Sequence, residues 1–149
     1  MLDKSKTIAL GCDHGGYALK EFLKIKIAES GYSVRDFGCY SADSIDYPDY
    51  AHPVASAVNS GQFPLAILIC GSGNGVCMTA NKYTNIRAAL CWNTELARLA
   101  RLHNDANILC LPGRFITENE ALSAVMAFLT TDFEGGRHQA RIEKIPLKQ

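Results

Sequence analysis

A cysteine stands at the head of a glycine-rich turn in the segment ICGSGNG, residues 69–75. An apolar run ends at Cys70, and Gly71, Gly73 and Gly75 follow it at alternate positions. Glycines at this spacing let backbone N–H groups turn toward a bound anion, and the N-terminus of a following helix stabilises a thiolate. Cys70 can therefore be a nucleophile or a proton acceptor, and a packed structural thiol is the competing interpretation.

Three common anion-binding loops do not match this turn. A Walker A loop requires G-x-x-x-x-G-K, which is absent. A dinucleotide-binding loop requires a further glycine at position 76, and a cysteine phosphatase loop requires an arginine there, whereas the residue is Val76. The turn therefore predicts anion binding of some other kind, or a simple strand-to-helix connection.

Histidines and arginines elsewhere suggest further polar sites. His14 follows Asp13 at the end of the first apolar run, where a strand would open onto a pocket. His103 ends an amphipathic helix and leads into the polar segment HNDAN, although a core histidine is the commoner role on such a face. Arg137 and Arg141 lie four residues apart, so both guanidinium groups leave one helix face and suit a phosphate. A solvated basic face is the alternative for this pair.

The composition is that of one soluble globular domain spanning residues 1–149. The 15 basic and 15 acidic side chains cancel, so no bulk charge recruits nucleic acid or a membrane surface. No apolar run approaches a membrane span, which predicts a cytoplasmic protein. The cysteines form no C-x-x-C pair and no zinc-finger spacing, so we expect free thiols, mostly buried, and no metal. They are Cys12, Cys39, Cys70, Cys77, Cys91 and Cys110.

Apolar runs alternate with helical patterns along the chain. The runs predict strands at 7–12, 32–37, 65–70, 86–91 and 107–112. Helices are expected at 17–30, 50–60, 75–81, 94–103, from the Thr117–Glu120 capping box onward, and at 136–144. Alternation of this kind predicts an α/β protein: a three-layer α/β/α sandwich around a five-stranded parallel, Rossmann-like sheet, with a protruding C-terminal helix. The strand order stays open.

Polar residues gather at the carboxyl ends of the predicted strands, where ligands bind in such sheets. These positions are Asp13 and His14, residues 70–75, Asn93, and Gly113 with Arg114. One rim of the sheet is therefore expected to hold the functional site.

Together these segments resemble the type B ribose-5-phosphate isomerases, in the family that includes galactose-6-phosphate isomerase subunits. Seven motifs occur in that family's order over nearly the whole chain: GCDHGGYALK (11–20), DYPDYA (46–51), ICGSGNG (69–75), ANK (80–82), HNDAN (103–107), PGR (112–114) and EGGRHQAR (134–141). The resemblance implies a metal-free, cofactor-free aldose–ketose isomerase of the pentose phosphate pathway, interconverting D-ribose 5-phosphate and D-ribulose 5-phosphate.

The resemblance also implies roles for individual residues. Cys70 would be the base that moves a proton between C2 and C1 through a cis-enediolate. Some relatives carry a glutamate base in the glycine loop, but position 75 is glycine here. Ser72 and the loop N–H groups would stabilise the enediolate oxygens, and His103 would assist ring opening.

Substrate binding would involve residues from both ends of the chain. Sugar hydroxyls would contact Asp13 and Asn104, with Tyr47 nearby. The loop that lines the site would be formed by Gly71, Gly73, Asn74 and Gly75. The phosphate would contact His14, Arg114, Arg137 and Arg141. The family is dimeric, sometimes tetrameric, with its site between subunits. The His103 segment and the C-terminal arginines are therefore expected to reach the site of a partner chain in a homodimer or tetramer.

Two alternatives remain at this point. The substrate could be a six-carbon sugar phosphate, allose 6-phosphate or galactose 6-phosphate. The galactose enzymes divide the catalytic residues between two different subunits, whereas this chain carries both Cys70 and His103. A nucleotide-binding regulatory module is the second alternative, because GCDHGG followed by Asp36 loosely imitates a dinucleotide site. Against it, Asp13 occupies the place where a pyrophosphate needs glycine.

Overall fold

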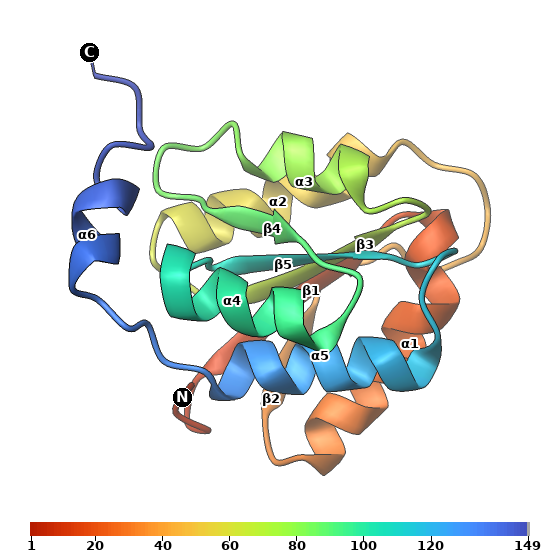
Figure 1. Cartoon of the computed structure of the whole chain (residues 1–149). Helices are drawn as coiled ribbons and strands as arrows, with labels where there is room; N and C mark the ends of the chain where they lie inside the picture. The colour runs from red at the N-terminus through yellow and green to blue at the C-terminus, as the bar shows by residue number, and fades with distance from the viewer. Residues whose placement is uncertain (149) are drawn as a thin grey trace.

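Five parallel strands form a single sheet at the centre of the computed structural model, which describes residues 1–148 (Figure 1). The strands are β1 (Thr7–Cys12), β2 (Ser33–Asp36), β3 (Ala66–Cys70), β4 (Ala88–Leu90) and β5 (Ile108–Pro112). Their order across the sheet is β2-β1-β3-β5-β4, and every neighbouring pair is parallel. The predicted α/β fold is confirmed, and the strand order that the sequence left open is now known.

Helices cover both faces of the sheet. They are α1 (Tyr17–Glu29), α2 (Tyr47–Asn59), α3 (Asn74–Ala80), α4 (Thr94–Asn104), α5 (Glu118–Thr130) and α6 (Arg137–Ile142), with a short 3₁₀ turn η1 (His14–Gly16) before α1. Side chains of α1, α4 and α5 pack in one core cluster and those of α2 and α3 in another. Among these described helices, not one has both the length and the apolar character needed to cross a membrane.

The handedness of the connections decides which face each helix covers. A strand–helix–parallel strand unit is almost always right-handed, so the direction of travel along the sheet determines the face. The chain moves one way from β1 to β2 and from β4 to β5, which places α1 and α4 on the same face. It moves the other way from β2 to β3 and from β3 to β4, and α2 and α3 lie opposite.

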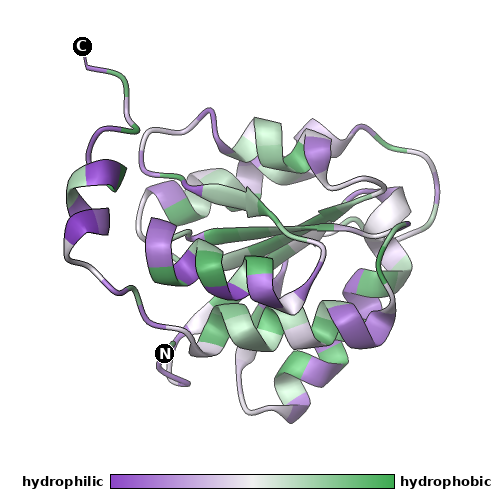
Figure 2. Ribbon diagram, in the orientation of Figure 1, coloured by the Kyte–Doolittle hydropathy of each residue, from purple (hydrophilic) through white to green (hydrophobic). Residues whose placement is uncertain are grey.

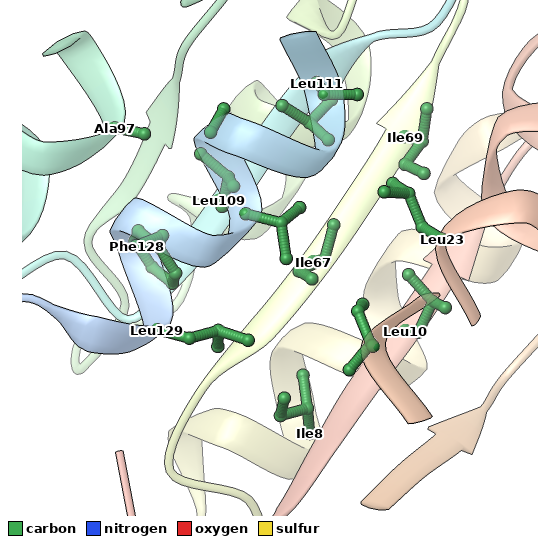
Figure 3. Packing of buried hydrophobic residues seen from close by; sticks show 14 of the residues in the cluster. Ile8, Leu10, Leu23, Ile67, Ile69, Ala97, Leu109, Leu111, Phe128 and Leu129 are labelled. Carbon is green, nitrogen blue, oxygen red and sulfur yellow. The ribbon is translucent and has the colours of Figure 1, made fainter. Parts of the chain in front are cut away.

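The central strands are apolar on both sides because both of their faces are covered. β3 and β5 are buried along their whole length. Figure 3 shows Ile67 and Ile69 of β3 in the same apolar cluster as Leu109 of β5 and Phe128 of α5. In Figure 2 the same strands are mostly green, whereas α6 is mostly purple. The core thus packs β3 and β5 on both faces up to their carboxyl ends, where the polar loops begin.

Helix ends follow the local signals in most places. The Asn93 side chain accepts the Leu96 N–H at 2.9 Å and caps α4, and Thr117 and Glu120 form the expected capping box of α5. One start differs: α2 begins at Tyr47 rather than at residue 50, because Pro48 falls in the first turn, where its missing N–H costs nothing.

His52 lies inside α2, where its Nδ1 is 2.9 Å from the Tyr83 hydroxyl.

The last helix stands off the sandwich beside the C-terminal end of α4, as expected (Figure 1). It is short, and only His138 and Ile142 on it are buried. Arg137 and Arg141 are exposed. The basic face of α6 therefore points away from the domain that carries it.

A buried lysine joins α1 to the end of β2. Lys20 is fully buried, and its Nζ lies 2.6 Å from Asp36 Oδ2 and 2.9 Å from Glu21 Oε1. The other oxygen of Asp36 accepts the Gly38 N–H at 2.8 Å. Although burial opposes it, hydrogen bonds from Lys20, Gly38 and Lys24 hold the pKa of Asp36 below its ordinary value. This network fixes the connections beside the carboxyl end of β1.

We predict that Asp36→Asn lowers the free energy of unfolding by about 3 kcal/mol, because it leaves a buried cation short of its main partner. The double variant Lys20→Met/Asp36→Asn should recover most of that loss, since no charge is then buried. Urea denaturation at pH 7 measures both.

The pKa of Asp36 is lower in the folded protein than in the unfolded chain. The stability that its carboxylate contributes is therefore fully present above the unfolded-state pKa and is lost as pH falls through the folded-state pKa. The difference between wild type and Asp36→Asn should therefore shrink in acid. A double variant no more stable than the single one would contradict the role of the buried charge.

Candidate active site

The candidate site lies where the strand order reverses direction. After β1 the chain leaves toward α1 on one face, and after β3 it leaves toward α3 on the other. Two neighbouring connections that diverge in this way leave a crevice at the carboxyl ends of the strands, where α/β proteins bind ligands. β5 contributes its own carboxyl end beside it, since Cys70 of β3 pairs with Pro112 of β5.

A pocket of about 350 Å³ occupies this crevice. It falls within the range of about 300 to 1,000 Å³ that is usual for small-molecule sites. The lining residues come from the ends of β1, β3 and β5 and from the start of α2: Asp13, His14, Tyr47, Cys70, Gly71, Ser72, Gly75, Arg114 and Phe115. The structure thus brings most of the residues expected at the strand ends into one pocket.

The glycine loop encloses the thiol. The Gly73 N–H donates a hydrogen bond to Cys70 Sγ at 3.1 Å, and the Asn74 N–H donates one to Ser72 Oγ at 3.3 Å. Gly73 has a φ of 76°, and a Cβ there would lie 2.4 Å from Leu90 Cδ1. Glycine at this position is therefore required both by the backbone conformation and by the available space. The donated N–H stabilises negative charge on the sulfur.

Asn74 lies just outside this pocket. It lines an adjoining hollow together with Ser72, Trp92 and Phe115. Gly73 is buried beneath the loop. The backbone N–H groups of both residues nevertheless contact residues that line the pocket, Gly73 with Cys70 and Asn74 with Ser72.

Two glycines allow side chains to lie against the loop. A Cβ on Gly75 would lie 2.6 Å from the Tyr47 ring, so the absence of a side chain lets that ring rest on the start of α3. A Cβ on Gly71 would lie 3.2 Å from Arg114 Nη1, and the Arg114 N–H donates to the Gly71 oxygen at 3.0 Å. The phenol and the guanidinium group are thereby held at the pocket wall.

Asp13 and His14 are oriented by backbone contacts. The Asp13 carboxylate is buried, and its Oδ1 accepts the Gly16 N–H at 3.1 Å as the cap of η1. His14 Nδ1 accepts the Ile45 N–H at 3.2 Å. In the neutral ring the proton is therefore on Nε2, which makes His14 a hydrogen-bond donor on its free side.

Most of the remaining thiols are unsuited to catalysis. Burial raises the pKa of Cys12, Cys91 and Cys110, with Cys91 at about 12, so these thiols stay protonated near neutrality. A hydrogen bond with Cys110 lowers the pKa of Cys77, but the Cys77 thiol lies 3.4 Å from the Ala88 oxygen and does not line the pocket. Cys70 is the cysteine that lines it.

Four of the expected site residues lie elsewhere: His103, Asn104, Arg137 and Arg141. α4 runs back from the carboxyl end of β4 to the start of β5, so His103 and Asn104 lie at the amino edge of the sheet. The pocket lies at the carboxyl edge, and the five residues of β5 separate the two edges by roughly 13 Å. Arg137 and Arg141 belong to α6 beside that distant end of α4 (Figure 1). One chain therefore presents two separate clusters.

The cluster at the end of α4 is itself well ordered. Asp105 ends the helix with a φ of 44°, and its carboxylate pairs with Arg87 at 3.0 Å and with Arg101 at 2.8 Å. Arg87 Nε also donates to the Asn104 oxygen at 2.9 Å. The His103 ring stacks on that of His138 with centroids 4.3 Å apart. The contacts of Asp105 and Arg87 order the backbone at the end of α4, which carries His103 and Asn104.

Sequence reasoning did not single out three residues at these places. His138 and Glu134 both fall in the segment EGGRHQAR, beside the predicted arginine pair, and Glu134 Oε2 lies 3.3 Å from His138 Nε2. Phe115 lines the pocket while remaining 75% exposed. A large exposed aromatic directly after the PGR motif was the available signal for it.

Known proteins resemble this chain over nearly its whole length. The model of a family described as Ribose/Galactose Isomerase matches residues 8–145. A ribose-5-phosphate isomerase B of Escherichia coli K12 is 44% identical over 140 residues, covering 94% of this chain and 94% of its own.

Solved structures agree with this likeness. A ribose 5-phosphate isomerase of Thermotoga maritima superposes with a TM-score of 0.92 at 48% identity, covering 95% of this chain and 97% of that one. A ribose-5-phosphate isomerase B of Mycoplasma genitalium, solved with bound ribulose-5-phosphate, gives 0.92 at 44% identity and covers 96% and 95%.

We predict that Gly73→Ala lowers the free energy of unfolding by about 3 kcal/mol, because it combines an unfavourable backbone conformation with a clash against Leu90. Gly61→Ala is the matched control, since Gly61 has a φ of 79° but a Cβ there meets nothing within 4 Å. Its cost should be about 1 kcal/mol, the backbone term alone. Equal losses for the two variants in urea denaturation would mean that Gly73 is not under steric constraint.

Proposed function

The chain belongs to the ribose/galactose isomerase family, and on that premise we propose that it interconverts D-ribose 5-phosphate and D-ribulose 5-phosphate. The observation that carries the proposal is the meeting of Cys70 with Asp13, Ser72 and Arg114 in one pocket at the diverging ends of β1 and β3. This isomerisation needs a base, a carboxylate that binds hydroxyl groups, a donor that stabilises an oxyanion, and a cation that binds the phosphate.

Cys70 is the base of the proposed reaction. Its thiolate removes the proton from C2 of the open-chain aldose. The electron pair of that bond forms the C1–C2 double bond while the π pair of the C1 carbonyl moves onto O1, giving a cis-enediolate. The thiol then returns the proton to C1 while a hydroxyl proton passes from O2 to O1, giving the ketose. The Gly73 N–H at 3.1 Å supports the thiolate before the proton is taken.

The loop stabilises the negative charge that develops on the sugar oxygens. Ser72 is exposed beside Cys70 at the wall of the pocket. Its hydroxyl and the loop N–H groups donate to the enediolate oxygens, in the manner of an oxyanion hole. The buried Asp13 carboxylate accepts from the sugar hydroxyls, and Tyr47 closes the wall above Gly75.

The phosphate lies at the Arg114 end of the pocket. The guanidinium group is a planar fork suited to phosphate oxygens, and the His14 ring can donate from Nε2. No ion pair engages Arg114 among the described residues 1–148. Its charge is therefore free for a ligand.

A second copy of the chain completes the site. His103 opens the furanose ring as an acid, but a chain's own His103 lies across the sheet from its own Cys70. In a homodimer, or a tetramer of such dimers, the end of α4 and the protruding α6 reach the pocket of the neighbour. Asn104 then contacts a sugar hydroxyl, and Arg137 and Arg141 meet the phosphate. This arrangement gives the exposed basic face of α6 a ligand.

We predict that Cys70→Ala lowers kcat/KM for ribose 5-phosphate by about 10² to 10⁴, the usual contribution of a general base. The assay follows ribulose 5-phosphate formation with a chelator present. Cys77→Ala is the matched control, because it removes a neighbouring thiol that does not line the pocket.

Folded Cys70→Ala protein with wild-type activity would mean that another group is the base. Wild-type protein inactive on ribose 5-phosphate but active on allose 6-phosphate would overturn the pentose assignment and leave the proposed chemistry in place.

We predict that two inactive variants restore each other if the site is shared. Cys70→Ala and His103→Ala are each expected to be nearly inactive as homodimers. After mixing and reassembly, half of the dimers carry both variants and one of their two sites is intact, so about a quarter of wild-type activity should return. Mixing Cys70→Ala with the doubly substituted chain is the control and should restore nothing. If the mixture of Cys70→Ala and His103→Ala stays inactive although mass spectrometry shows that the subunits have exchanged, Cys70 and His103 of one site would belong to the same chain.

A further inference from the structure

A second group of ligating side chains lies where α4 ends and α6 begins. His103, Glu134 and His138 each place a ligating atom within 4.8 Å of the other two. Glu134 Oε2 is 3.3 Å from His138 Nε2 and 3.7 Å from His103 Nε2. The Glu134 N–H donates to the Leu102 oxygen at 2.9 Å, which holds this acid against α4.

His138 supplies an independent sign of a missing ligand. Its side chain is 6% exposed, and its Nε2 is buried without a hydrogen-bond partner among the described residues. Buried polar atoms are nearly always satisfied, and one that is not calls for an explanation. The Glu134 carboxylate is near this nitrogen but not in hydrogen-bond geometry. A ligand entering between the two groups would satisfy the nitrogen.

We propose that His103, Glu134 and His138 bind a divalent transition-metal ion of the Zn²⁺ class. Two imidazoles and one carboxylate are a common zinc ligand set, which leaves the fourth position open. Bonds of about 2.0 to 2.1 Å in a tetrahedron separate the ligand atoms by roughly 3.3 Å. The distances of 3.3 and 3.7 Å to Glu134 are close to that spacing.

The cluster can adjust to a metal at little cost. His103 and Glu134 are 36% and 56% exposed, so both side chains can turn, whereas the buried His138 serves as the anchor. The His103 ring, now stacked on His138 with an interplanar angle of 13°, has to rotate for its nitrogen to converge on a shared ion. Nitrogen ligands favour Zn²⁺, Co²⁺ or Ni²⁺ over Mg²⁺ and Ca²⁺.

Neighbouring charges shift the pKa of His138 in opposite directions. Burial, and then the charges of His103, Arg137 and Arg141, lower the pKa of His138 against the opposing effect of Glu134. The ring is therefore neutral near pH 7, which is the form that binds metal. The same arginines repel a cation, so the site should bind less tightly than a structural zinc site.

A metal ion bound at this cluster would inhibit the enzyme, and this consequence rests on the proposed function. His103 is the proposed ring-opening acid, and a metal on its Nε2 removes it from that role. Binding of the metal itself does not depend on the reaction. The two statements can therefore fail separately.

The first experiment measures binding directly. Metal-free protein is titrated with Co²⁺, and the visible absorption of a tetrahedral ion is recorded; Zn²⁺ is titrated by calorimetry. We expect one ion per chain, with affinity reduced by about tenfold or more in His138→Gln and in Glu134→Gln. His52→Gln is the matched control, since His52 is an exposed histidine outside the cluster.

The proposal would be overturned if neither the Co²⁺ spectrum nor a heat of Zn²⁺ binding is seen at metal concentrations up to about 100 µM. A Kd of that size corresponds to a binding free energy of roughly −5.5 kcal/mol. Zn²⁺ binding that survives His138→Gln and disappears in Cys70→Ala would overturn it too, by assigning the ion to a thiol.

The second experiment measures the consequence. Zn²⁺ should inhibit ribose 5-phosphate isomerisation by the wild type, chelator should restore it, and Glu134→Gln should shift the inhibition to about tenfold higher Zn²⁺. Binding at the cluster without inhibition would overturn the inhibitory role alone. A protein that is inactive with chelator yet gives the Co²⁺ spectrum would refute the proposed function and leave the metal site standing.

Discussion

The right-handed crossover of parallel strands is the constraint on which this structure depends. Because β1 and β3 are neighbours and their connections move in opposite directions along the sheet, α1 and α3 must lie on opposite faces. The two loops then separate at their base, and the crevice between them cannot be filled by either helix. Every residue that lines the pocket enters from a strand end or a helix start at this point.

Close packing around the loop converts that crevice into a chemical site. The left-handed backbone at Gly73 directs an N–H at the Cys70 sulfur, and the small residues at 71 and 75 let Arg114 and Tyr47 lie against the loop. Burial keeps Cys12, Cys91 and Cys110 protonated, whereas Cys70 lies at the pocket wall with a donor beside it. The environment therefore distinguishes one cysteine from several that look alike in the sequence.

The same topology separates the two halves of the proposed chemistry. A helix that returns to the start of the next strand carries its last residues to the opposite edge of the sheet, so His103 cannot meet its own Cys70. Arg87, Asp105 and Arg101 nevertheless hold the end of α4 in one conformation. Such ordering of a remote polar segment is what a neighbouring subunit, or a metal ion, would require.

Much of the fold and roughly one half of the site followed from the sequence, because both depend on local pattern. Apolar runs and the Thr117–Glu120 capping box predicted the elements, and strand-end residues such as Asp13 and Cys70 share a rim in any parallel sheet. Only the tertiary structure decided the strand order, the distance between Cys70 and His103, and the approach of His138 to Glu134. These depend on contacts between residues far apart in the chain, which a local pattern does not encode.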